Sequence, residues 1–240
     1  MRLAVLELPA RFARQLEALD DARRLLAERP CDLAVLPECA LTGYVSPDGD
    51  FDLSRFAEPQ ATSGQLEALR ALAVEAGCHV AGPWIEADGG RAFNACAVFS
   101  PTGDEIAVYR KRHPWYPEVW ATPGREPHPT FTVAGVRATI AICFDIHFVA
   151  SEADGALAAS DLLIFPSAWV DDEPGDGRAD LLGGLASRFG VTIANANWGP
   201  GEPAIRGQGG SRVVTPGGAA VVAESVLGCA RRVDHDLETY

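Results

Sequence analysis

The stretch V-R-A-T-I-A-I-C-F-D-I-H-F, residues 136–148, constrains the fold more than any other segment of this chain. Its first seven residues hold four β-branched side chains and no Pro or Gly, which is typical of a buried strand. The strand reaches Cys143, and the sequence then becomes Ala-rich and helix-like up to Ser160. A cysteine between a strand and a helix lies near a helix N-terminus, where the dipole favours a thiolate. We therefore interpret Cys143 as a nucleophile; a small buried hydrophobic residue is the alternative.

The acidic composition excludes several classes of function. With a formal net charge of −13, the chain lacks the clustered basic residues that nucleic-acid binding requires. No apolar run approaches the roughly 18 residues of a membrane span, and Glu7 interrupts the apolar N-terminal run. The six cysteines are scattered without a C-x-x-C pair, so neither a zinc site nor a disulfide framework is indicated. We expect a cytoplasmic protein without metal or cofactor that binds neither nucleic acid nor membrane.

The chain uses arginine almost everywhere that it needs a basic residue. Of its 20 basic residues, Lys111 alone is a lysine. A compact ammonium approaches a small reacting atom in a way that a planar guanidinium does not. This count indicates a chemical role for Lys111, and chance survival of one lysine under codon bias is the alternative.

The order of predicted elements indicates an α/β fold. Helices are expected at 11–29, 63–76 and 181–189, and strands at 2–8, 32–36, 78–86, 93–100, 105–110, 136–142, 161–165, 191–196, 209–214 and 219–224. Two similar halves with hairpins predict helices packed outside two facing sheets, with the second hairpin closing the chain. No linker or repeat is visible, so residues 1–240 are expected to form one domain.

Three polar residues follow strand-like runs. Glu38 follows D-L-A-V-L-P, Lys111 follows I-A-V-Y-R, and Cys143 follows A-T-I-A-I. Side chains at the same end of neighbouring strands converge on one crevice, the usual place of α/β active sites. A base, a cation and a thiol that meet there form a plausible centre for acyl transfer.

The segments around these residues, L-P-E-C-A-L-T-G-Y, Y-R-K-R-H and I-C-F-D-I-H-F, resemble the three motifs of the nitrilase superfamily of carbon–nitrogen hydrolases. Further segments, such as F-N-A-C-A-V-F-S-P-T-G and D-L-L-I-F-P-S-A-W, are similar to family segments in family order. The resemblance covers nearly the whole chain. It implies a four-layer αββα sandwich with two mixed β-sheets flanked by helices.

The resemblance also implies a Glu–Lys–Cys triad. Cys143 would attack the carbonyl carbon and form a thioester, and Glu38 would move the proton and activate water. Lys111 and the backbone N–H of Phe144 would stabilise the oxyanion. Many family members place a second Glu before a Pro-Gly pair, and Glu118 fits that position in a segment that looks shortened; a solvated loop carboxylate is the alternative.

Other features bear on the substrate. The usual Arg-Phe-Pro-Glu after the nucleophile is replaced by residues 147–150, H-F-V-A. His147 is either a substrate contact or a satisfied, partly buried histidine, and the second interpretation is favoured. The pocket is expected to be lined by Tyr44, Trp169 and the region from Trp115 to Trp120. The alternative is that these aromatic side chains fill the core.

These observations predict an amidohydrolase that cleaves a small linear amide or N-carbamoyl compound through a thioester and releases ammonia or an amine. Nitrile hydrolysis is the nearest rival, but the family's nitrilases usually carry Trp-Glu where this chain has Phe144 and Asp145. A silent nitrilase-like binding protein is the other alternative; the complete triad argues against it. Because the family commonly dimerises through the helix after the nucleophile, and small residues fill 153–159, we expect a homodimer or a higher homo-oligomer.

Overall fold

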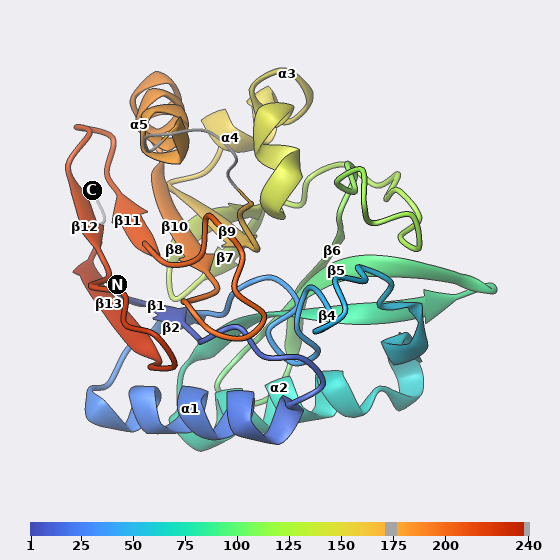
Figure 1. Cartoon of the computed structure of the whole chain (residues 1–240). Coiled ribbons are helices and arrows are strands. Elements are labelled where there is room, and N and C mark those ends of the chain that lie inside the picture. Colours follow the sequence, from blue (N-terminus) through green and yellow to red (C-terminus); the bar gives the residue numbers. More distant parts are fainter. Residues whose placement is uncertain (171–176, 238–240) are drawn as a thin grey trace.

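A computed structural model describes residues 1–170 and 177–237, and in this part of the chain two mixed β-sheets pack face to face (Figure 1). The first sheet has the order β13 (Arg231–Asp236), β1 (Arg2–Glu7), β2 (Leu33–Val35), β4 (His79–Asp88), β5 (Arg91–Phe99) and β6 (Glu105–Arg110), with β3 (Glu58–Pro59) beside β4. The second has the order β12 (Ala220–Val222), β11 (Arg212–Val214), β10 (Thr192–Asn197), β9 (Leu162–Ser167), β8 (Val136–Ile140) and β7 (Phe131–Val133). In each sheet the central strands are parallel: β1, β2 and β4 in the first, and β8, β9 and β10 in the second.

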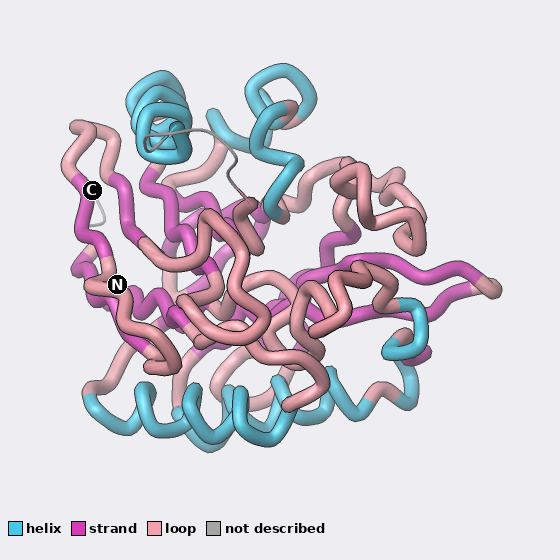
Figure 2. Tube along the Cα trace, in the orientation of Figure 1, coloured by secondary structure: helices cyan, strands magenta, loops and turns pink. Residues whose placement is uncertain are grey.

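Helices cover the two outer faces of the paired sheets (Figure 2). The first sheet is covered by α1 (Gln15–Glu28) and α2 (Gly64–Ala76), and the second by α3 (Val149–Glu152), α4 (Asp154–Ala158) and α5 (Gly177–Phe189). Short 3₁₀ turns are η1 (Ser54–Phe56), η2 (Gln60–Thr62) and η3 (Cys143–His147). This is the αββα sandwich that the sequence predicted, and none of the described helices is long and apolar enough to cross a bilayer.

The strand sequences explain the layering. In β1, Leu3 and Val5 point into the core between the sheets, whereas Ala4 and Leu6 point toward the helices. Both faces of the strand are buried, so an apolar run without alternation is what this position requires. The residues that follow the parallel strands therefore emerge together at one edge of the sandwich.

Two helix predictions need correction. The helix expected at 11–29 begins only at Gln15, because Ala13 has a positive φ of 56° and breaks the helical path. The helix expected after Cys143 is instead η3 followed by the short helices α3 and α4. By contrast, α2 ends as expected at Gly77, which has a φ of 62°.

The prediction that the second hairpin closes the chain was wrong. After β11 and β12 the chain returns to the first sheet, where β13 pairs antiparallel with β1. The sequence of β13, R-R-V-D-H-D, holds a single apolar residue, Val233, which enters the core between the sheets. One inward side chain on an edge strand gives no detectable alternation. The short strand β7 was missed as well.

The loop between β6 and β7 folds back against the first sheet. Thr122 N–H donates to Ala92 O over 2.7 Å, and Gly124 N–H donates to Lys111 O over 2.8 Å. A Cβ atom on Gly124 would lie 2.3 Å from the carbonyl oxygen of Arg110, which is backbone and cannot swing away. Only glycine therefore allows the loop to lie this close to the end of β6.

We predict that Gly124→Ala lowers the free energy of unfolding by roughly 1–3 kcal/mol, because the backbones must separate. Gly184→Ala is the matched control. Gly184 is exposed within α5 with nothing near its added Cβ, so this change should raise the unfolding free energy by about 0.5–1 kcal/mol. Urea unfolding of both variants measures the difference. Equal stability of Gly124→Ala and the parent would show that the close approach is not required.

Candidate active site

Four side chains from distant parts of the chain meet at the edge where the strands end. Glu38 follows β2, Lys111 follows β6, and Cys143 begins η3 directly after β8. Glu118 comes from the loop after β6, and all four side chains are buried. The structure thus brings together the three residues at predicted strand ends and the fourth from the shortened loop.

Lys111 lies between two carboxylates. Its Nζ donates to Glu38 Oε1 over 2.7 Å and to Glu118 Oε1 over 2.6 Å, with no side-chain exposure at Lys111. Burial alone would lower the pKa of Lys111, but the charges of Glu118 and Glu38 outweigh it and raise that pKa well above its usual value. The raised pKa favours the ammonium form, and the burial of this side chain between two acids argues against the alternative that one lysine survived by chance.

Glu38 is held by donors on both oxygens. Besides Lys111, Asn94 Nδ2 donates to Oε1 over 2.7 Å, and the Ala168 N–H donates to Oε2 over 2.8 Å. The carboxylate is thus fixed by β5 of one sheet and by the end of β9 of the other. Sequence reasoning missed Asn94, although an Asn inside the apolar strand F-N-A-C-A-V-F was an available signal.

Glu118 reaches Lys111 because the short loop turns on itself. Glu118 N–H donates to Trp115 O over 2.7 Å, and Ala121 N–H donates to Glu118 O over 3.0 Å. Tyr44 Oη donates to Glu118 Oε1 over 2.5 Å. Burial raises the pKa of Glu118 and outweighs the ammonium of Lys111, which lowers it. Tyr44 was expected in the pocket wall; the structure places it against Glu118 instead.

Cys143 lies at a strained turn. Its φ is 44°, a left-handed conformation that is costly for a residue with a Cβ. Burial raises the pKa of the Cys143 thiol well above its usual value, the charge of Glu38 raises it further, and Lys111 opposes both. The expectation that a helix dipole favours the thiolate was wrong, because the thiol is buried beside carboxylates. The raised pKa favours the protonated thiol over the thiolate.

Asp145 joins the turn of Cys143 to the segment after Lys111. Its carboxylate accepts from the N–H groups of Ile142 (3.1 Å), Arg112 (3.1 Å) and His113 (2.8 Å), and from Tyr109 Oη (2.8 Å). Burial raises the pKa of Asp145, while these donors lower it. The sequence analysis assigned Asp145 no role, although an acid within a buried strand-to-helix turn needs partners.

The residues that replace the usual Arg-Phe-Pro-Glu have their own bracing. The His113 ring stacks on Phe148 with centroids 3.8 Å apart. Glu152 accepts from Arg112 over 3.1 Å and lies 3.0 Å from His113 Nε2. Contacts from the segment after Lys111 to Phe148, which precedes α3, and to Glu152, the last residue of α3, therefore stand where the sequence seemed to have lost support.

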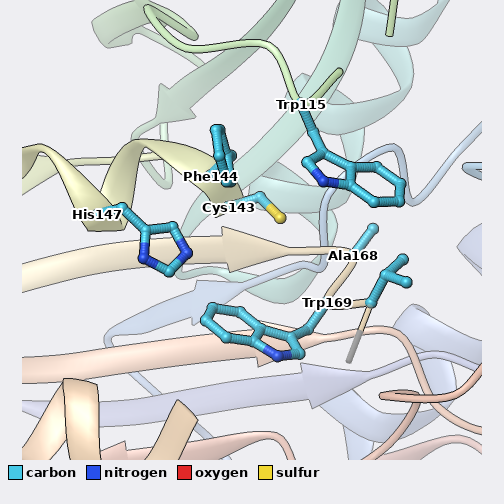
Figure 3. Close-up of a pocket in the computed structure, with 7 residues that line it drawn as sticks. Trp115, Cys143, Phe144, His147, Ala168 and Trp169 are labelled. Carbon is cyan, nitrogen blue, oxygen red and sulfur yellow. The ribbon is translucent and has the colours of Figure 1, made fainter. Parts of the chain in front are cut away.

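A cavity of about 80 Å³ opens at the nucleophile, and its walls are Trp115, Phe144, His147, Ala168, Trp169, Val170 and Cys143 itself. Figure 3 shows the sulfur of Cys143 pointing into the space between Trp115 and Trp169. His147 lies on the other side of Cys143, with its ring 5.1 Å from Phe144 and 5.8 Å from Trp169. Larger grooves of about 710 and 770 Å³ lie elsewhere, but none of the four converging side chains lines them.

His147 is exposed and forms no hydrogen bond with any described residue, so it is not the partly buried histidine, satisfied by the protein, that was favoured. Partial desolvation at the cavity lowers the pKa of His147. Within residues 1–170 and 177–237, no group of three or more His, Cys, Asp or Glu side chains is placed to hold a metal ion.

Comparison with known proteins gives a consistent family match. The carbon–nitrogen hydrolase family model matches residues 2–225. An omega-amidase from Xenopus laevis is 30% identical over 156 residues, covering 60% of this chain and 54% of the relative. A hydrolase from Pseudomonas protegens is 28% identical over 229 residues, covering 92% of this chain and 78% of the relative. The chain thus spans only about half the length of the amphibian enzyme.

The fold also matches solved structures. A mutant of the amidase from Nesterenkonia sp. AN1 is 25% identical, with a TM-score of 0.81 over 98% of this chain and 93% of that chain. In that protein acrylamide has added to the active-site cysteine.

We predict that Tyr44→Phe lowers the free energy of unfolding by about 1–3 kcal/mol, because a buried carboxylate loses a donor while the ring packing is kept. Tyr116→Phe, at a tyrosine that is 78% exposed, is the control and should change nothing. Denaturant titration compares the two variants. Parent-like stability of Tyr44→Phe would mean that the hydroxyl does not support Glu118.

Proposed function

Since this chain belongs to the carbon–nitrogen hydrolase family, we propose that it hydrolyses a small linear amide or N-carbamoyl compound through a thioester on Cys143. The observation that carries the proposal is the buried cluster in which Lys111 bridges Glu38 and Glu118 beside that thiol. The omega-amidase and amidase relatives support it.

In the proposed acylation step, Cys143 Sγ attacks the carbonyl carbon as Glu38 takes the thiol proton. The raised pKa of the Cys143 thiol means that no thiolate is stored, so a base must act during the attack. Glu38 suits this task because Lys111, Asn94 and the Ala168 N–H hold its carboxylate in one orientation. The same proton then passes to the leaving nitrogen, and ammonia or an amine departs.

We propose that Lys111 and the backbone N–H of Phe144 stabilise the negative charge that develops on the carbonyl oxygen. The ammonium is already desolvated and fixed by two carboxylates, so little reorganisation is needed as the oxyanion forms. Glu118 acts as a positioning residue that holds Lys111. In deacylation Glu38 removes a proton from the water that attacks the thioester. It returns that proton to the departing Cys143 sulfur as the acid is released, which restores the thiol.

We also make a proposal for the oligomeric state of the protein and for the cell compartment in which it acts. We propose that two copies pair through the segment that contains α4, where small residues permit close approach. We also propose a cytoplasmic protein, because the six cysteines are free thiols and a reducing compartment keeps them so.

The activity is tested by ammonia release across short amides, N-carbamoyl amino acids and aliphatic nitriles. We expect release from amides and none from any compound with Cys143→Ala, which should stay folded because it loses only a thiol. Cys39→Ala, next to Glu38, is the matched control and should retain activity. Release from nitriles alone would contradict the amidase assignment, and no release from any compound would contradict catalysis.

Lys111→Arg tests the oxyanion assignment with the net charge unchanged. The longer, forked guanidinium cannot occupy the position of Nζ between the two carboxylates. We expect turnover to fall by about 10²–10³-fold, with a smaller change in KM. Arg110→Lys, one residue away in the Glu86 ion pair, is the control and should keep turnover. Near-parent turnover of a folded Lys111→Arg variant would remove the lysine from the mechanism.

A further inference from the structure

We infer that the substrate is a short amide whose acyl part carries no charge, so that aliphatic amides are strongly preferred over amides and N-carbamoyl compounds that bear a carboxylate. The inference rests on the proposed function and narrows its substrate class. It separates this chain from an enzyme for amides that carry a carboxylate; several of its relatives are named omega-amidases.

The described residues that line the cavity offer no positive charge. Five of its seven residues, Trp115, Phe144, Ala168, Trp169 and Val170, are aromatic or aliphatic, and the others are the nucleophile and a histidine. Partial desolvation lowers the pKa of that histidine, His147, which favours its neutral form.

Cations near the cavity already have partners. Lys111 is shared by Glu38 and Glu118, so one ammonium faces two carboxylates. Arg112 pairs with Glu152 at 3.1 Å. Arg178 stacks on Trp169, with Cζ 5.7 Å from the ring centroid, but its Nη2 donates to Gly209 O over 2.8 Å.

A substrate carboxylate would therefore lose water in this cavity and gain no counter-ion from the described residues that line it. Taking an ion out of water without a partner is costly, and the nearby carboxylates of Glu38 and Glu118 would add repulsion. A methyl group in the same place would instead pack against the indole rings of Trp115 and Trp169. The difference favours the neutral substrate of equal length.

The cavity also limits length. Its volume of about 80 Å³ is far below the 300–1,000 Å³ of a typical ligand pocket. A cavity of this size favours a short acyl group.

Butyramide and succinamic acid have chains of equal length, with a methyl group at the end of one and a larger, charged carboxylate at the end of the other; the His147→Arg variant described below separates charge from size. We expect kcat/KM for butyramide to exceed that for succinamic acid by about 100-fold or more. The kcat/KM for hexanamide should be at least about tenfold lower than that for butyramide, because the longer chain overfills the cavity. Comparable kcat/KM values for the charged and neutral pair would overturn the inference while leaving the amidase proposal intact. Turnover of none of the three, without an acyl adduct by mass, would overturn both.

His147→Arg tests the physical reason. A guanidinium at the cavity wall should pair with the carboxylate of succinamic acid. The ratio of kcat/KM for butyramide to kcat/KM for succinamic acid should therefore decrease at least about tenfold. His147→Gln is the matched control, polar but uncharged, and should keep the preference ratio. An unchanged ratio in a folded His147→Arg variant would contradict the role assigned to the missing charge.

Discussion

The ammonium of Lys111, buried between Glu38 and Glu118, is the interaction on which the rest of the site depends. Three charges held out of water stabilise one another only while all three are in place; removing one partner of a buried ion pair typically costs about 3–5 kcal/mol. The fold must therefore bring the ends of β2 and β6 and the turn that carries Glu118 close together in space.

Hydrogen bonds from both sheets hold the cluster of Glu38, Lys111 and Cys143 in place. Glu38, from the first sheet, accepts the N–H of Ala168 at the end of β9 in the second. Asp145 ties the turn of Cys143 to the segment after Lys111 through backbone N–H groups. The chain segments that carry the base, the cation and the thiol are thus joined to one another or to the opposite sheet by hydrogen bonds.

The sequence predicts the sandwich and most of the cluster because both have local signals. A polar residue that directly follows an apolar strand locates Glu38, Lys111 and Cys143 without any partner being known. Asn94, the contact of Tyr44 and the strand β13 depend on pairings between residues far apart in the chain. The protonated thiol was missed for a related reason, because its pKa follows from neighbours that only the fold brings close.

Mapping the acylated residue is the most direct test of this account. Acid-quenched protein incubated with a short amide should gain the acyl mass by intact-mass spectrometry. Peptide mapping should place that mass on Cys143, and the adduct should be labile to hydroxylamine, as a thioester is. Acylation of Cys39, which also has a positive φ and lies beside Glu38, or an adduct that persists in Cys143→Ala, would contradict the assignment of the nucleophile.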